Sequence, residues 1–225
     1  AQNINANAEL GDVIKVQIQS KEFGRIATQN AKNVILQKIR EEERKVLYDQ
    51  YYGMEKEVVT GIVQRIMGKN VSVNLGKADA ILSEKEQVRG EEFQPTERIK
   101  VYILEVKDTP KGPRIEVSRT HPGLVKRLFE SEVAEVKDGT VEIKSIAREA
   151  GSRTKIAVWS NDPDVDPVGA CVGMNGARVN SVVEELRGEK IDIINWDENP
   201  AILIENALSP AKVIAVMADP DEKTA

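Results

Sequence analysis

One segment of this chain reads Asp166-Pro-Val-Gly-Ala-Cys-Val-Gly-Met-Asn-Gly-Ala-Arg-Val-Asn-Ser-Val-Val-Glu-Glu-Leu186, and its pattern predicts a helix, a tight glycine turn and a second helix. Asp166 is a good N-cap residue, and Pro167 suits the first helical position because its missing N–H is not needed there. The first helix is predicted to end at Gly173, since glycine accepts the left-handed conformation of a helix C-terminus. After Gly176 the second helix places four apolar residues on one buried face, namely Val179, Val182, Val183 and Leu186.

The loop between the two helices, Gly173-Met174-Asn175-Gly176, is a Gly-x-x-Gly sequence. Two glycines allow a foreign backbone to come close, because no Cβ stands in the way. The N–H groups at the start of the following helix carry partial positive charge and suit a phosphate. A KH module clamps about four nucleotides of single-stranded RNA in this way. The alternative interpretation of the same residues is an ordinary helical hairpin.

Two other phosphate or metal motifs do not fit this segment. A dinucleotide-binding fingerprint requires glycine where Cys171 stands, and the preceding strand is predicted to end near Ser160, too far away for a strand-to-helix turn. The run Asp162-Pro-Asp-Val-Asp166 resembles the start of a calcium loop. However, Pro167 occupies the position of the turn glycine and Gly173 that of the bidentate glutamate, which excludes calcium.

The composition of the chain limits the classes of protein to consider. Its 225 residues leave room for two or three small domains, and 31% charged with 40% hydrophobic residues is typical of a soluble globular protein. No apolar run has membrane length and no secretory signal is present, so we expect a cytoplasmic protein without a membrane partner. One cysteine and one histidine exclude a disulfide framework and a Cys/His metal site. We therefore expect no cofactor and no metal.

Charge and termini add two further expectations. The net charge of −5 argues against a general polyanion binder, so any nucleic acid must be held by local geometry. The chain begins with Ala1 and ends shortly after an apolar run. We expect a fragment excised at both ends.

The N-terminal part predicts a strand followed by a long helix. Residues 12–19 alternate and are β-branched, which is typical of a strand. Residues 25–51 have a helical period with an apolar stripe in their first half. Because residues 40–50 are polar nearly all round, we expect that half of the helix to be a spacer that is not packed tightly on the following domain.

Residues 55–119 predict a small barrel of the OB type, with five short strands separated by glycines and a proline. The expected strands are 57–66, 70–75, 78–82, 98–106 and 113–119. Residues 57–92 contain no aromatic side chain, so the front strands offer no platform for stacking bases. Arg65, Lys69 and Lys77 are candidate phosphate contacts, although such residues are usually solvated surface.

Residues 121–196 predict the element order helix, strand, strand, helix, helix, strand, which is that of a type II KH domain (αββααβ). The strands are expected at 140–148, 154–160 and 190–196, and the first helix begins at His121. This single histidine has no evident partner and is interpreted as structural. A helix at 201–208 and a strand at 213–217 then repeat the opening of the domain before the chain ends. The fold class is therefore α+β with several domains.

The chain resembles the NusA family of bacterial transcription elongation, termination and antitermination factors from about residue 10 to its end. Three groups of residues carry this resemblance, one in the long helix, one just after the barrel and one around the Gly-x-x-Gly loop. They are Phe23-Gly-Arg-Ile-Ala-Thr-Gln-Asn-Ala-Lys32 with Val34-Ile-Leu-Gln37, then His121-Pro-Gly-Leu-Val-Lys-Arg-Leu-Phe129, and then Asp166–Met174 and Gly176–Val179 with Gly151–Ala157 and Gly188–Ile193. The family commonly has arginine where this chain has Asn175.

The resemblance implies the domain organisation. Residues 1–52 correspond to the end of the polymerase-binding N-terminal domain with its long linker helix, and residues 53–120 to an S1 barrel. Residues 121–198 correspond to the first KH domain, and residues 199–225 to the beginning of a second, truncated KH domain.

The resemblance also implies a function. The expected protein is a monomeric, non-enzymatic RNA-binding factor that modulates pausing, termination and antitermination. Its expected partners are nascent single-stranded RNA, RNA polymerase and other elongation and antitermination factors. The expected RNA-binding residues are those of the loop and its flanks, with two secondary candidates on the preceding strand: Val172, Gly173, Met174, Asn175, Gly176, Ala177 and Arg178, then Arg153 and Lys155.

Two alternatives remain open at the level of sequence. The first is a polymerase-docking module with little RNA binding of its own, because residues 150–200 hold five Arg/Lys against nine Asp/Glu. The second is a processive ribonuclease of the polynucleotide phosphorylase type, which also carries KH and S1 modules. In that family the KH domain precedes the S1 domain, whereas the order here is reversed and no catalytic core is present.

Overall fold

A computed structural model describes residues 24–218 and Thr224. The first helix, α1 (Arg25–Tyr52), is continuous, as the sequence predicts. The chain divides into two units, one ending at Glu43 and the other beginning at Arg44. In the first unit the apolar side chains of α1, such as Val34 and Ile35, are exposed. None of the described helices is long and apolar enough to cross a membrane. The strand predicted at 12–19 lies outside the described residues.

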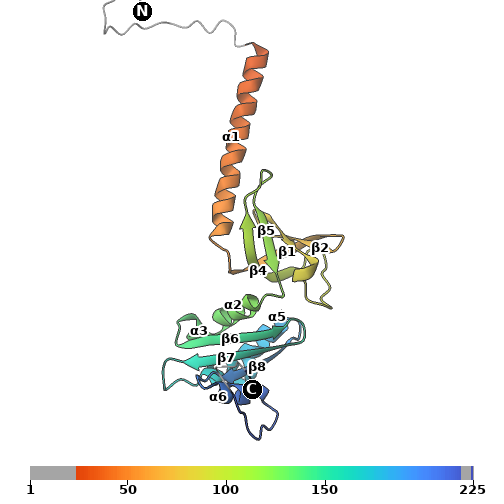
Figure 1. The fold of residues 1–225 in the computed structure, drawn as a ribbon. Coiled ribbons are helices and arrows are strands. Elements are labelled where there is room, and N and C mark those ends of the chain that lie inside the picture. The colour runs from red at the N-terminus through yellow and green to blue at the C-terminus, as the bar shows by residue number, and fades with distance from the viewer. Residues whose placement is uncertain (1–23, 219–223, 225) are drawn as a thin grey trace, which may run out of the picture. The chain divides into compact units, whose positions relative to one another are not determined.

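The second unit begins with a closed five-stranded barrel in the order β1-β2-β3-β5-β4 (Figure 1). All neighbouring strands are antiparallel except β3 and β5, which pair in parallel. The barrel predicted from the spacing of turn residues is therefore confirmed. Its strands are β1 (Val58–Met67), β2 (Asn70–Asn74), β3 (Asp79–Leu82), β4 (Arg98–Lys107) and β5 (Arg114–Ser118), with a short helical turn at Glu84–Glu86.

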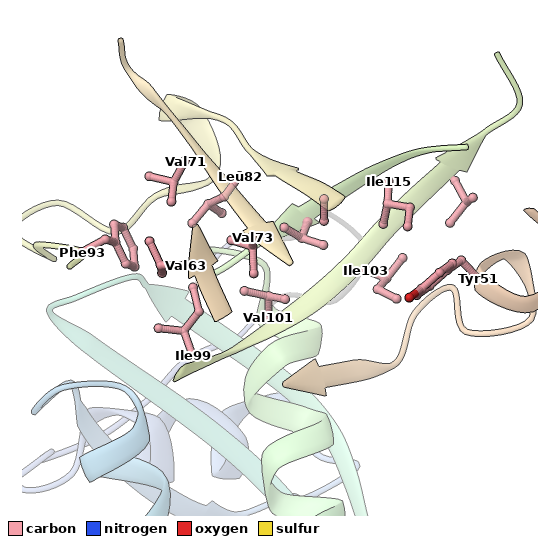
Figure 2. Packing of buried hydrophobic residues seen from close by; sticks show 13 residues of the cluster. Tyr51, Val63, Val71, Val73, Leu82, Phe93, Ile99, Val101, Ile103 and Ile115 are labelled. Carbon is pink, nitrogen blue, oxygen red and sulfur yellow. The ribbon is translucent and has the colours of Figure 1, made fainter. Parts of the chain in front are cut away.

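The barrel interior is filled by β-branched and aliphatic side chains, one from every second position of each strand. Figure 2 shows them converging from all five strands, with Phe93 from the β3–β4 connection at one end. The innermost are completely inaccessible to solvent: Val63, Val73, Leu82, Val101, Ile103 and Ile115. This interior is a packed core, so any ligand of the barrel must bind its outside.

The last turns of α1 pack on the end of this barrel. Tyr51 is 2% exposed and belongs to the barrel core, with Leu47 and Tyr48 packed against it. The Tyr51 hydroxyl donates a hydrogen bond to the carbonyl of Leu75 at 3.1 Å. The expectation that residues 40–50 stay unpacked is therefore wrong. Leu47, Tyr48 and Tyr51 lie at i, i+1 and i+4 and form a narrow apolar stripe. The charged residues around this stripe make it hard to detect in the sequence pattern.

The αββααβ order predicted for the second domain is confirmed. Its three-stranded sheet has the order β6-β7-β8, with β6 antiparallel and β8 parallel to the central strand. A one-turn helix, α3, was not predicted. The elements are α2 (Pro122–Glu132), α3 (Ala134–Lys137), β6 (Val141–Glu149), β7 (Arg153–Ser160), α4 (Pro167–Val172), the 3₁₀ turn η2 (Met174–Gly176), α5 (Ala177–Glu185) and β8 (Lys190–Asn195).

His121 has partners, contrary to the expectation. It caps α2, since its Nδ1 accepts a hydrogen bond from the backbone N–H of Gly123 at 3.0 Å. Its ring also stacks on that of Tyr102 in β4, with centroids 4.7 Å apart and planes 7° from parallel. The histidine therefore starts the second domain against the barrel, in agreement with its interpretation as structural.

The helix α6 (Pro200–Leu208) follows the sheet and contacts β8. The amide Nδ2 of Asn206 donates to the carbonyl of Asn195 at 3.1 Å. The strand predicted at 213–217 is wrong, because these residues form no strand in the structure. Ile214 and Met217 are exposed there. A strand needs a neighbour to pair its N–H and C=O groups, and none of the described strands pairs with these residues.

A buried arginine joins the barrel to the second domain. The side chain of Arg119 is 1% exposed and pairs with both oxygens of Glu91 at 2.6 and 2.7 Å. The same guanidinium donates to the carbonyl of Lys100 in β4 at 2.7 Å and to that of Glu185 in α5 at 3.0 Å. One side chain thus satisfies acceptors from both domains.

A second buried ion pair lies within the αββααβ domain. The side chains of Arg148 and Glu189 are 1% and 0% exposed, and two hydrogen bonds of 2.9 Å join them. Glu189 also accepts from the backbone N–H of Gly151 at 2.8 Å and from the hydroxyl of Thr154. Burial alone raises the pKa of Glu189, but these hydrogen bonds outweigh it and hold the pKa below its ordinary value.

Candidate nucleic-acid interface

The helix–loop–helix segment forms as the sequence predicts. Asp166 caps α4, its side chain accepting from the backbone N–H of Val168 at 3.2 Å. The chain then leaves α4 at Gly173 with φ 74° and ψ 177°, a conformation open to glycine alone. Asn175 and Gly176 follow in the left-handed region, at φ 53° and 78°. Asparagine tolerates this region better than most residues, which gives Asn175 a structural reason to be in the loop.

Arg178, the first-turn arginine of α5, is held inside the motif. A Cβ at Gly173 would lie 2.8 Å from the Arg178 Cγ, so the arginine stem crosses directly over this glycine. Its Nη1 donates to the carbonyl of Ala170 at 2.7 Å and to the carboxylate of Glu135 at 3.0 Å. Arg178 therefore closes the C-terminal end of α4 and is neutralised by a neighbouring acid.

The tip of the loop is open to solvent. Met174 is 86% exposed, and Asn175 and Ala177 are also exposed, while Val172, Gly173 and Gly176 are half-buried. Within residues 24–218, no group accepts a hydrogen bond from the backbone N–H of Met174 or Asn175. These two amides and the start of α5 make a small positively polarised surface.

Arg153 and Lys155 lie on the other face of the sheet. Along β7, Ile156 and Val158 point into the core beneath the helices, so the alternate positions 153 and 155 point away from it. Both cations pair there with Asp192 of β8, the arginine through two hydrogen bonds of 2.5 and 3.0 Å. The hydrogen bond from Arg153 is the main cause that holds the pKa of Asp192 below its usual range. The structure therefore does not bring these two residues to the loop.

The three barrel candidates are also dispersed. Arg65 is exposed on β1. Lys69 pairs with Glu84 at 2.8 Å, and the Nζ of Lys77 lies 3.4 Å from the side-chain oxygen of Gln50. The predicted residues thus form one continuous group at the loop and two separate groups elsewhere.

The sequence analysis did not single out Trp159 and Trp196, which the structure brings together. Their rings meet edge to face, with centroids 5.7 Å apart and planes at 85°. They line a hollow of about 490 Å³ beyond the ends of β7 and β8. The signal in the sequence was that both tryptophans of the chain end predicted strands of the same domain.

The remaining reactive side chain, Cys171, is buried in α4. Burial raises the pKa of its thiol to about 11. In the described part of the chain, no group of three or more His, Cys, Asp or Glu residues is arranged to hold a metal ion.

Comparison with known families divides the chain into three matched segments. Residues 1–45 match the NusA N-terminal domain, residues 53–118 the S1 RNA binding domain, and residues 119–196 the NusA-like first KH domain. The order of these segments is the one expected from the sequence.

Three relatives, each described as transcription termination/antitermination protein NusA, are similar along nearly the whole chain. The protein of Bacillus subtilis (strain 168) is 54% identical over 223 residues, covering 99% of this chain and 60% of the relative. That of Halalkalibacterium halodurans is 52% identical over 224 residues (100% and 59%), and that of Thermus thermophilus 44% identical over 218 residues (96% and 56%). The chain thus spans at most 60% of the length of these relatives.

Proposed function

The chain belongs to the NusA family, and from that premise we propose that it is an RNA-binding transcription factor whose Gly-x-x-Gly loop clamps single-stranded RNA. The observation that carries the proposal is the pair of unbonded amides at the exposed tip of the loop, on Met174 and Asn175. They directly precede the N-terminus of α5, where a phosphate is stabilised by hydrogen bonds and by the helix dipole. The side chains of Arg178 and Asn180 lie over Gly173 and Gly176, so the RNA backbone would approach the exposed tip between the two glycines.

The proposed activity is to hold nascent RNA beside RNA polymerase and so modulate pausing, termination and antitermination. Similarity to NusA proteins supports polymerase and other elongation or antitermination factors as partners. We assign polymerase binding to residues 1–52, the S1 barrel to 53–120, the first KH domain to 121–198 and the start of a second to 199–225. Within this scheme the protein acts as a cytoplasmic monomer without catalysis.

The side chains around the loop add little positive charge to this site. Arg178 is neutralised by Glu135, while Arg153 and Lys155 lie on the other face of the sheet and share the one carboxylate of Asp192. This pairing favours the alternative function, a polymerase-docking module with little RNA binding of its own. The two functions differ in one measurable property, which is whether RNA affinity depends on the loop.

Replacing Met174 and Asn175 together by Asp tests this dependence. Two carboxylates at the tip would repel the phosphate and remove its favourable field, so we expect the affinity for single-stranded RNA to fall at least tenfold, about 1.4 kcal/mol or more. Fluorescence anisotropy with a labelled oligoribonucleotide measures the change. Both side chains are exposed, so circular dichroism and the melting temperature should stay close to those of the parent chain.

The matched control places two aspartates at exposed positions of α1, in the double variant Ile26→Asp, Val46→Asp. It adds the same charge outside the proposed site and should change the affinity less than twofold. If the loop variant binds RNA as well as the control does, RNA does not pass over the loop and the docking function is the better assignment.

Asn175→Arg tests the departure from the family. A charge-assisted hydrogen bond contributes roughly 1.5–3 kcal/mol against about 1 for a neutral one, and exposure reduces the difference to about 0.5–1 kcal/mol. We expect RNA to bind a few-fold more tightly at low salt, with the log–log salt slope steeper by up to about 0.7. Because position 175 is left-handed, arginine there should also lower the stability by about 1 kcal/mol.

Glu184→Gln is the matched control for this substitution, since it makes the exposed surface of α5 more positive by the same single charge, two turns beyond the loop. An equal gain in affinity for both variants would assign the effect to the general field of the domain. A gain confined to Asn175→Arg supports a direct contact with the phosphate.

A further inference from the structure

The hollow at the end of the sheet has the position of a ligand site. It lies beyond the carboxyl ends of β7 and β8, which are parallel. The space outside the carboxyl ends of parallel strands is where open α/β sheets bind their ligands. Its volume of about 490 Å³ is in the range of small-molecule pockets.

Aromatic rings form one wall of the hollow. Trp159 is 42% exposed and meets Trp196 edge to face, so part of its side chain is accessible to a ligand. The backbone N–H of Trp196 donates to the carbonyl of Val158 at 2.8 Å, and Lys144 lies 5.6 Å from the centre of its ring. Both contacts hold Trp196, against which Trp159 packs, and the pair makes a stacking surface.

The charged groups of the hollow are two carboxylates, which only accept hydrogen bonds. Asp162 and Asp197 each use Oδ1 to accept a backbone N–H of the next turn, at 2.9 and 2.8 Å. None of the described residues donates to their Oδ2 atoms. The Nδ2 of Asn161 donates to the carbonyl of Gly139 and to the carboxylate of Glu142, so this donor is already used. A phosphate is repelled by such a lining, whereas a neutral planar ligand with N–H donors fits it.

The hollow and the loop lie at opposite ends of α4. Pro167, the first residue of that helix, lines the hollow, and Gly173 of the loop follows its last residue. A helix of six residues is about 9 Å long. A strand clamped by the loop therefore has only a short distance to cover before its next bases reach the tryptophans.

We propose that this hollow binds a base of the same RNA strand, by stacking on Trp159, and that it prefers bases with an exocyclic amino group. The exocyclic amino group of adenine, cytosine and guanine offers two N–H donors to the carboxylates of Asp162 and Asp197, whereas uracil offers only its single N3–H. The inference rests on the proposed function, since it requires RNA at the loop. It assigns the hollow a part in base preference, which the loop amides cannot supply.

Tryptophan fluorescence gives a direct test, because Trp159 and Trp196 are the only two tryptophans of the chain. The probes are oligo(A), oligo(C) and oligo(U) of equal length, titrated while anisotropy of a labelled copy reports total binding. We expect oligo(A) and oligo(C) to quench the fluorescence at saturation, and oligo(U) to quench it less and bind more weakly. Equal quenching and equal affinity for all three would overturn the base preference.

Two substitutions locate the effect. Trp159→Ala should weaken binding of oligo(A) by about tenfold, within the usual range for loss of a stacking aromatic, and Trp159→Phe should weaken it less because a ring remains. Asp197→Asn retains an acceptor for its turn but removes the charge, and should narrow the preference for oligo(A) over oligo(U). Tyr52→Ala, which removes an aromatic side chain that is 55% exposed on α1, is the control and should leave binding unchanged.

The outcomes separate the inference from the proposed function. RNA binding that depends on the loop, with no fluorescence change and no effect of either Trp159 variant, overturns the inference and leaves the function intact. Absence of RNA binding in the anisotropy measurement overturns both. Fluorescence that changes when RNA polymerase is added, and not with RNA, assigns the hollow to a protein partner and also overturns the inference.

Discussion

Glu189→Ala is expected to lower the free energy of unfolding by about 3–5 kcal/mol, the usual range for breaking a buried ion pair from one side. The substitution leaves the guanidinium of Arg148 buried without its counter-ion, since that side chain is only 1% exposed. It also removes the acceptor of the Gly151 N–H and of the Thr154 hydroxyl. Urea denaturation followed by circular dichroism measures the loss.

Two controls accompany this prediction. Glu189→Gln keeps acceptor and volume but not the charge, so its loss should lie between that of the alanine variant and the parent chain. Glu149→Ala removes an exposed glutamate from the end of β6 and should change the stability by less than about 0.5 kcal/mol. A Glu189→Ala loss as small as that would mean that the buried pair contributes little to the fold.

The pH dependence follows from the same group. The pKa of Glu189 is lower in the folded chain than in the unfolded chain. The unfolded state therefore takes up a proton first, and the stabilisation is fully present above the unfolded pKa of about 4.3. It is lost as the pH falls through the folded pKa. The stability difference between the parent chain and Glu189→Gln should accordingly shrink on acidification below about pH 4.

Arg119→Ala is expected to lower the free energy of unfolding by a similar amount, about 3–5 kcal/mol. It should also split unfolding into two separate transitions. The substitution removes the two short hydrogen bonds to the carboxylate of Glu91, whose side chain is 5% exposed, and leaves it with the Arg187 guanidinium at 4.0 Å. It also removes the donor that bridges the carbonyls of Lys100 in the barrel and Glu185 in α5. With that bridge gone, the barrel and the KH domain should unfold at different temperatures in differential scanning calorimetry.

Arg119→Lys tests whether geometry matters as well as charge. Lysine retains the charge, but its ammonium group lacks the planar set of donors with which arginine bonds acceptors in both domains. Most of the loss in stability should therefore remain. Arg114→Ala, which removes from β5 an exposed arginine that pairs with Glu116, is the control; Arg119 itself follows the last residue of that strand. A single transition with an unchanged midpoint in Arg119→Ala would show that the domains are coupled by other contacts.

Local pattern was sufficient for most of the fold. The N-cap at Asp166, the glycine turn and the buried face of α5 each depend on neighbouring residues, and all three form as predicted. The same holds for the barrel, because glycines and prolines mark where its strands end. The strand expected at 213–217 failed for the opposite reason, since a strand exists only with a partner and local alternation cannot supply one.

The site was harder to predict because the state of a charge depends on residues distant in sequence. Arg178 has the right spacing to flank a phosphate, yet its partner is Glu135, 43 positions earlier. Arg153 is held by Asp192, 39 positions later. Neither pairing has a local signature. The tryptophan hollow was also missed. β7 and β8 pair in parallel, so their C-terminal ends lie together although an entire helical hairpin separates them in the sequence.

The burial of Cys171 also determines how the protein can be labelled. It is the single cysteine of the chain, and maleimides and iodoacetamides react with the thiolate, which a buried thiol with a pKa of about 11 hardly forms at neutral pH. An introduced cysteine can therefore be labelled in the native sequence without replacing Cys171. A cysteine introduced at Met174, where the side chain is 86% exposed, accepts a dye while Cys171 stays unmodified. Distances from the loop to an RNA end then become measurable by energy transfer without first removing a native thiol.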